Sequence, residues 1–190
     1  KVIAGPMVVD GADTGVAIEI RAGGPAIGSD SVAAEMYIDD PRTLGYGTTD
    51  GMILRNDKTP MLSVMAPLEK NPQIIYWDPE KYPDIKTLSD LGEAGVTINV
   101  FGGGQFADVF VAQGIWKAEQ VDQSYDGSPA RFVSDGDIAQ QGFASAEPWI
   151  YKNEVDEYGR DLQFQLLSDA GFPVYSQTLA IRTEDRDALA

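Results

Sequence analysis

The sequence predicts an α/β protein, in which strands and helices alternate along a chain of 190 residues. One observation is the segment 97–110, where a β-rich run enters three consecutive glycines and a helical pattern leaves them. Another is the hydrophobic content of 43%, which is enough to bury one sizeable core or two small ones. The third is a pair of extended crossings, 76–86 and 169–173, that would link two compact halves. Helices between strands also favour parallel pairing.

The first half of the chain contains several recognisable elements. Alternating apolar residues predict a strand at 16–20, followed by a Gly-Gly-Pro turn at 23–25. Asp30 or Ser31 is placed to cap a helix that runs through Tyr37. We further predict short buried strands at 43–46 and 60–66, around a turn at 56–58, and another strand at 73–77.

The second half continues the alternation. A short capped helix is predicted at 87–91, a strand at 96–101, and a helix from Gln105 that ends at Gly114. After these we predict a strand at 130–133, a helix at 135–141, a buried strand at 142–146, a helix from Pro148 to Tyr158, and strands at 162–167 and 178–182.

The two crossings divide the chain into two predicted lobes. The second lobe would be the self-contained block 85–171, and the first would combine 1–84 with 172–190. Because the chain opens at Lys1 without a methionine and stops in a helix-like start, we expect both ends to be truncated and the first lobe to be incomplete. A cleft is expected between the lobes, where the carboxyl edges of their sheets converge.

The composition narrows the possible chemistry. The chain contains no histidine and no cysteine, which removes imidazole acid–base catalysis, thiolate nucleophiles and Cys/His zinc sites. No segment has the ligand spacing of a calcium-binding loop. We therefore predict a protein that is not an enzyme and that needs neither a cofactor nor a metal.

The charge sets a second limit. A formal net charge of −16 predicts repulsion from nucleic acid and from anionic membrane surfaces, and no basic cluster compensates for it. No apolar run approaches the roughly 18 residues of a transmembrane helix.

The glycine turn at 102–104 would bring free backbone N–H groups and the positive end of a helix dipole to one place. Its spacing is that of neither a dinucleotide fingerprint nor a phosphate loop. The turn therefore has two interpretations, a cradle for an anionic or strongly polar group and a tight connection without a ligand.

Three segments carry a family resemblance: 86–106, then 135–149 with its Ala146-Glu147-Pro148-Trp149 ending, and 169–176. Together they resemble solute-binding proteins of ABC importers, in the branch of the nitrate, sulfonate and taurine receptors and the thiamine-pyrimidine-precursor receptors. The resemblance covers most of the chain from about Ile74 onward. Gln105 stands where a small hydroxyl residue is common in that branch, which weakens the expectation of an oxyanion ligand.

The resemblance implies a two-lobed periplasmic-binding-protein-like fold of type II, with parallel or mixed sheets flanked by helices. It implies an extracytoplasmic receptor, in the periplasm or as a cell-surface lipoprotein, whose export signal lies outside this chain. Such a receptor is a monomer that closes over a small polar molecule, here a pyrimidine-like heterocycle, and docks transiently on an ABC permease. The alternatives are a nitrate, sulfonate or taurine receptor, a ligand-sensing domain of a transcription regulator, and a carboxylate-based enzyme on the same fold.

The expected ligand-binding residues combine aromatic faces with a few directed polar groups. They are Tyr46, Thr48, Thr49, Asp50, Gly103, Gly104, Gln105, Phe106, Glu147, Trp149 and Tyr175. For some of them a structural role is an equal contender: Glu147 as a helix-start carboxylate, Trp149 as a core residue, and 48–50 as a turn or helix cap. Trp77 and Trp116 are assigned to packing.

Overall fold

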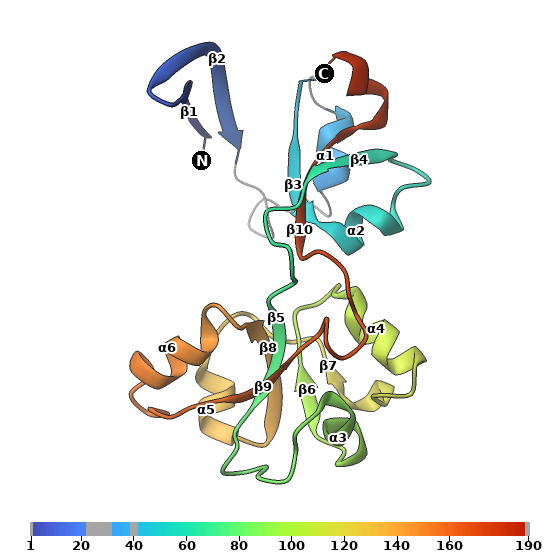
Figure 1. Cartoon of the computed structure of the whole chain (residues 1–190). Coiled ribbons are helices and arrows are strands. Elements are labelled where there is room, and N and C mark those ends of the chain that lie inside the picture. Colours follow the sequence, from blue (N-terminus) through green and yellow to red (C-terminus); the bar gives the residue numbers. More distant parts are fainter. Residues whose placement is uncertain (1, 22–31, 39–41, 189–190) are drawn as a thin grey trace.

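The computed structural model describes residues 2–21, 32–38 and 42–188. These residues form a mixed α/β protein with three separate sheets, a hairpin, a three-stranded sheet and a five-stranded sheet (Figure 1). The predicted α/β class is therefore confirmed. The predicted turn at 23–25 and the cap at Asp30 or Ser31 lie outside the described residues.

The hairpin consists of β1 (Val2–Val9) and β2 (Ala12–Arg21), paired antiparallel around Asp10 and Gly11. Both turn residues have positive φ, 49° and 79°, as a two-residue hairpin turn requires. The predicted strand at 16–20 is confirmed as part of β2. Side chains from Ala4 to Arg21 are exposed, so this hairpin is held mainly by its own ladder of backbone hydrogen bonds.

The three-stranded sheet is antiparallel, with β10 (Gln177–Arg182) between β3 (Gly45–Thr48) and β4 (Met61–Met65). It is accompanied by α1 (Val32–Ile38), α2 (Thr49–Leu54) and the 3-10 helix η3 (Thr183–Ala188). The helix through Tyr37 and the strand at 178–182 are confirmed. The strand at 60–66 exists but is largely exposed rather than buried, because β4 is an edge strand of a small sheet.

Gly45 explains how α1 sits on this sheet. A Cβ at Gly45 would fall inside contact distance of the Met36 sulfur, so α1 can approach β3 only where no side chain intervenes. Met36 and Ala33 are buried at this contact. The strand predicted at 43–46 is displaced to 45–48 by this packing, and α2 was not predicted.

The five-stranded sheet has the order β7-β6-β8-β5-β9. Its strands are β5 (Gln73–Trp77), β6 (Thr97–Asn99), β7 (Val121–Asp122), β8 (Ile138–Phe143) and β9 (Gln163–Leu166). The neighbours β7, β6 and β8 are parallel, whereas β5 pairs antiparallel with both β8 and β9. Parallel pairing is thus confirmed only for the part of the sheet where helices connect the strands.

Helices lie on both faces of this sheet (Figure 1). On one side are α3 (Leu88–Glu93) and α4 (Gln105–Ala112), followed by the 3-10 helix η2 (Ala118–Gln120); on the other are α5 (Ala130–Asp135) and α6 (Glu147–Asn153). The predicted capped helix at 87–91 is confirmed, because Thr87 and Asp90 form a reciprocal capping box at its start.

Two hydrophobic clusters fill the faces. The cluster under α3 and α4 contains Trp77 and Trp116, which confirms their assignment to packing. The cluster under α5 and α6 contains Phe132, whose ring packs edge-on against Tyr76 with centroids 4.9 Å apart. Each face of the sheet therefore has its own core.

The segment 130–146 folds differently from the prediction. The strand predicted at 130–133 is helix α5, because burying Phe132 against the sheet face requires a helix that ends at Gly136 with a φ of 58°. The helix predicted at 135–141 is wrong: Asp135 is the last residue of α5, 136–137 form the connection, and 138–141 belong to β8, a central strand covered on both faces. The strand predicted at 142–146 keeps only its first two residues in β8, and α6 ends at Asn153, well before Tyr158.

Two chain segments, 66–72 and 167–176, connect the three-stranded and five-stranded sheets (Figure 1). They leave the larger sheet side by side: the Leu167 N–H donates to the Gln73 carbonyl at 3.0 Å, and Lys70 pairs with Asp169 at 2.6 Å. The crossing predicted at 76–86 is therefore misplaced, since β5 already belongs to the five-stranded sheet. The division at residues 84 and 172 stays a prediction, but the sheet boundary falls before residue 73. No helix within the described ranges is long and apolar enough to cross a membrane.

Candidate functional site

The parallel strands β6, β7 and β8 end at one edge of the five-stranded sheet. The loops that follow them are the glycine turn 100–104, the loop 123–129 and the turn 144–146. In open α/β sheets, ligands bind outside the carboxyl ends of such strands. In Figure 1 the first turns of α4 and α6 lie at this edge, on the side nearer to the three-stranded sheet.

The glycine turn forms as the sequence predicts. Gly103 has a φ of 84°, a conformation that L side chains rarely adopt, and Gly104 is the N-cap of α4 without a side-chain cap. The Gln105 amide folds back and donates from Nε2 to the Gly103 carbonyl at 3.2 Å. Phe106 points the other way and is buried in the core with Phe110, Trp116 and Phe172. Its expected ligand contact is wrong, since the apolar face of α4 requires this ring.

A hollow of about 180 Å³ lies beside the glycine turn, between the end of β6 and the start of α5. It is lined by Asn99, Ser124, Tyr125, Asp126, Ser128, Ala130 and Arg131. This volume is below the range of about 300–1,000 Å³ typical of drug-sized ligand pockets. The hollow therefore fits a small molecule or one polar group of a larger ligand.

Hydrogen bonds fix the polar wall of the hollow. Asn99 donates from Nδ2 to the Asp122 carbonyl and to Ser124 Oγ, both at 3.2 Å. Arg131 donates from Nη1 to Ser124 Oγ at 2.9 Å and forms an ion pair with the Asp122 carboxylate. That bond from Arg131 lowers the pKa of the Asp122 carboxyl below its usual value. The guanidinium charge is thus neutralised by an aspartate of the protein itself.

A buried polar cluster adjoins the hollow, on the face of the sheet that α5 and α6 cover. Gln140 is the register partner of both Asn99 and Tyr76, so the three side chains share the face covered by α5 and α6. Gln140 donates from Nε2 to the Tyr76 hydroxyl at 2.6 Å, and that hydroxyl donates to the hydroxyl of Tyr151 at 2.9 Å. Burial raises the pKa of Tyr76, so this cluster stays protonated and neutral.

An aromatic pair borders the hollow. The rings of Phe101 and Tyr125 lie 4.4 Å apart at their centroids, and Phe101 is 40% exposed. The Phe101 N–H donates to Gln141 Oε1 at 3.0 Å, which holds the start of the glycine turn. Gly127, at a φ of 92°, packs its backbone close to the Phe101 ring. The pair therefore offers a fixed apolar surface next to polar groups.

Glu147 and Trp149 have different surroundings although both belong to the first turn of α6. Glu147 accepts the Phe143 N–H through Oε2 at 2.5 Å, which ties the helix start to the end of β8. Trp149 is 59% exposed, so it is not a core residue. Burial raises the pKa of the Tyr125 hydroxyl, and the nearby Glu147 carboxylate raises it further, so Glu147 acts electrostatically on the edge of the hollow.

The other expected residues form a second group at the end of the three-stranded sheet. Tyr46 donates from its hydroxyl to Gln177 Oε1 at 3.2 Å, and the Thr49 N–H donates to the Ser176 carbonyl at 3.3 Å. Asp50 accepts the N–H of Gly51 at 2.8 Å within the first turn of α2. Thr48, at the N-cap position of α2, and Tyr175 are exposed. Within the described ranges, no hydrogen bond joins this group to the edge of the five-stranded sheet.

The residues that line the hollow are not predictable from the motifs of the sequence. Asn99, Asp126 and Arg131 come from three different elements, and the two-residue strand β7 that brings them together carries no pattern of its own. The available signal was the turn-rich run Ser124-Tyr125-Asp126-Gly127-Ser128 after a strand, which marks a loop at a sheet edge.

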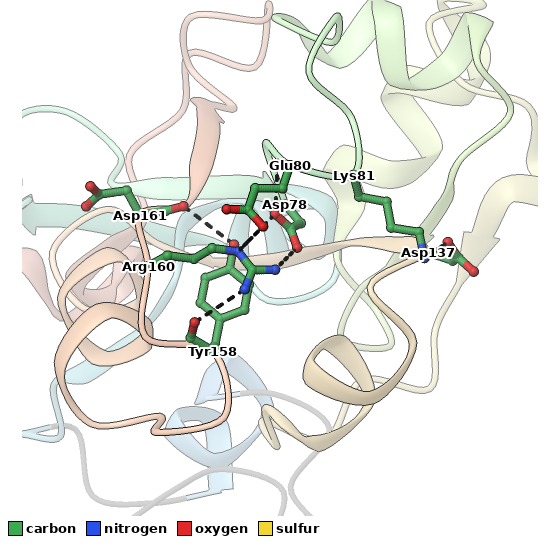
Figure 2. Close-up of polar contacts among 7 residues, drawn as sticks. All are labelled: Asp78, Glu80, Lys81, Asp137, Tyr158, Arg160 and Asp161. Carbon is green, nitrogen blue, oxygen red and sulfur yellow. Dashed lines mark hydrogen bonds and ion pairs between the residues drawn. The ribbon is translucent and has the colours of Figure 1, made fainter.

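Two other features are structural. Figure 2 shows ion pairs around Arg160, which contacts Asp78 and Glu80 and lies over the Tyr158 ring at 4.1 Å. Asp78 directly follows β5 and Asp137 precedes β8, so this cluster lies at the edge opposite the hollow. A concavity of about 490 Å³ along the hairpin is walled only by β1 and β2, and Asp13 supplies its single charged side chain. Neither has the converging polar groups of a ligand site.

Known proteins give no further guidance on this edge. No family model matches the chain, and a search of curated proteins finds none that matches it.

Proposed function

We propose that this chain belongs to an extracytoplasmic solute-binding protein of an ABC importer. In this proposal the two larger sheets are the centres of two lobes of a type II periplasmic-binding-protein fold. The proposal depends on one observation above all: a polar hollow and an exposed glycine turn share the carboxyl edge of the five-stranded sheet, on the side nearer to the other sheet.

The residues at this edge favour binding over catalysis. The chain holds no histidine or cysteine, so imidazole acid–base catalysis and thiolate nucleophiles are excluded. The polar groups in the wall of the hollow bond to one another: they are Asn99, Asp122, Ser124 and Arg131. The Glu147 carboxylate accepts a hydrogen bond from a backbone N–H. Such mutual bonds hold a surface in one shape, and we propose that the role of this edge is recognition.

The two connections support a closing motion. Segments 66–72 and 167–176 run between the sheets, and the Lys70–Asp169 ion pair links one to the other. In our proposal they act as the hinge, and the second group of residues, around Tyr46, Thr49 and Tyr175, approaches the hollow in the closed state. The ligand favours closure because only the closed state allows it to contact both groups.

The partners follow from this role. The closed protein would dock on an ABC permease, and the receptor would act as a monomer in the periplasm or as a cell-surface lipoprotein. The ligand is a small polar molecule. A pyrimidine-like heterocycle suits the exposed rings of Phe101 and Trp149 better than nitrate or a simple sulfonate does, because a planar ring can stack on them.

A thermal-shift screen followed by calorimetry tests the proposal. A ligand that binds only the folded protein raises the midpoint of unfolding, so cytosine and 4-aminopyrimidine are compared with nitrate, methanesulfonate and taurine. Glu147→Gln and Trp149→Ala should each weaken binding of any hit while the variant stays folded. Glu157→Gln, a charge-matched change on an exposed residue outside the site, is the control.

Small-angle scattering of the free and ligand-saturated protein then tests closure. We expect the radius of gyration to fall on saturation. Binding without any change in dimensions would contradict the two-lobed mechanism, and the absence of binding by either set of probes would contradict the receptor itself.

A further inference from the structure

The charges around the hollow do not balance. Of the two charged residues that line it, Arg131 is already paired with Asp122. Asp126 has no cationic partner among the described residues, and its Oδ1 accepts only the Ser128 N–H at 2.8 Å. Glu147, close enough to act on Tyr125, is likewise bonded to a backbone N–H and not to a cation. The edge of the hollow therefore carries net negative charge.

An acceptor in the wall of the hollow also favours a cation with N–H donors. Asn99 is 1% exposed, and its Nδ2 donates to the Asp122 carbonyl, which can only accept. This bond fixes the orientation of the amide and leaves Oδ1 as the remaining atom. Among the described residues no donor reaches Oδ1, although Asn99 lines the hollow. Oδ1 is therefore left to accept a hydrogen bond from water or from a donor that enters the hollow.

We propose that the hollow binds a small organic cation with N–H donors, a protonated primary amine or an amidinium group. Asp126 supplies the counter-charge, Asn99 Oδ1 accepts an N–H, and the Phe101–Tyr125 pair provides the aromatic surface that a cation also favours. This inference rests on the proposed receptor function and names the chemical class of its ligand.

An anion fits the same wall poorly. It would face the Asp126 carboxylate and the Asn99 oxygen, and the carboxylate repels a charge of its own sign. Arg131 offsets this only in part, because the Asp122 carboxylate already neutralises its charge. The net charge of −16 over the whole chain adds long-range attraction for cations.

Titration calorimetry at low salt tests the inference with three kinds of probe. Ethanolamine and agmatine are the cations, ethylene glycol is the uncharged counterpart of ethanolamine, and nitrate and methanesulfonate are the anions. We expect the cations to bind, the anions not to bind, and ethylene glycol to bind at least tenfold more weakly than ethanolamine. Raising the salt concentration should weaken cation binding.

Asp126→Asn locates the site. Asparagine keeps the Oδ1 acceptor for the Ser128 N–H, so the loop can hold its shape while the charge is lost. We expect cation affinity to fall about tenfold or more, and Glu157→Gln, with the same change in net charge, to leave it unchanged. Equal affinity in the Asp126 variant and the wild type would overturn the assignment.

The outcomes separate the two proposals. Binding of an anion that is lost in Trp149→Ala, with no binding of the cations, overturns the cation inference and keeps the receptor. Binding of the cations without closure in scattering keeps the cation site and contradicts the receptor mechanism. Binding by none of the probes contradicts the inference, whatever the heterocycle screen shows.

Discussion

Glu147 accepts the backbone N–H of Phe143 at 2.5 Å, so the carboxylate expected to touch a ligand also joins the first turn of α6 to the end of β8. Gly142 makes room for this contact, because a Cβ there would lie 2.8 Å from Glu147 Cδ. The two residues therefore form one structural unit at the carboxyl edge of the sheet.

The first prediction concerns the coupling of these two residues. Gly142→Ala should push the Glu147 side chain away and lower the unfolding free energy by about 1–2 kcal/mol, as should Glu147→Ala. The double variant should cost clearly less than the sum, because the alanine at 142 no longer meets a side chain. Denaturant unfolding of the four proteins measures the cycle, and strict additivity would show that Gly142 does not act through Glu147.

The second prediction concerns Gly92 in α3. A Cβ at this position would overlap the backbone carbonyl of Ile115, which cannot rotate away as a side chain can. Gly92→Ala should therefore cost about 3 kcal/mol and lower the melting temperature by about 6–12 °C. Ser89→Ala, an exposed change in the same helix, is the control and should alter the melting temperature little.

The third prediction concerns pH. Burial alone raises the pKa of the Asp78 carboxyl, but hydrogen bonds from Arg160 and from the Glu80 N–H outweigh it and hold the pKa below its usual value. A carboxyl with a lowered pKa stabilises the fold above its unfolded pKa of 3.8, and this contribution is lost as the pH falls through the folded value.

Asp78→Asn should accordingly lower the unfolding free energy by about 2 kcal/mol at pH 7, a figure reduced from that of a fully buried pair because the Arg160 side chain is 36% exposed. The difference between wild type and variant should shrink below about pH 4. Comparing the two proteins at each pH cancels the general effect of the large negative charge. A difference that stays constant down to pH 2 would show that the Asp78 charge contributes nothing.

The fourth prediction uses the three tryptophans as reporters. Trp77 and Trp116 are buried, whereas Trp149 is 59% exposed. Trp149→Phe should shift the native emission to shorter wavelength and remove most of the acrylamide-quenchable signal, with a change in stability within about 0.5 kcal/mol. Trp116→Phe, which loses the indole bond to the Leu88 carbonyl at 3.1 Å, should do the opposite. Unchanged quenching in Trp149→Phe would place this ring inside the protein.

Local signals in the sequence predicted much of the fold. The apolar run of β5, the Thr87–Asp90 capping box of α3 and the proline in the first turn of α6 each determine their element without help from distant residues. The prediction for the segment 130–143 failed because the structure of this segment depends on tertiary burial. Phe132 lies in a helix, from which its ring packs against Tyr76, and Gln140 lies in a strand that pairs with β5.

The candidate site, too, was predictable from the sequence only in part. The glycine turn was visible because its backbone conformation requires glycine at 103. The hollow was not visible, because Asn99 and Arg131 meet only through strand pairing of β6 with β7. Phe106 was assigned to the ligand because the sequence alone does not tell which side of α4 faces the core.

The central position of β10 has a consequence for the order of folding. Thr178 bonds to Ser63, 115 residues earlier in the chain, so the three-stranded sheet cannot close until the intervening chain has been ordered. Closing so long a loop through an unfolded chain is entropically costly, whereas a folded five-stranded sheet would already hold residues 74 and 166 side by side. We expect the five-stranded sheet to fold first during synthesis, and the smaller sheet to assemble only after residue 182 has left the ribosome.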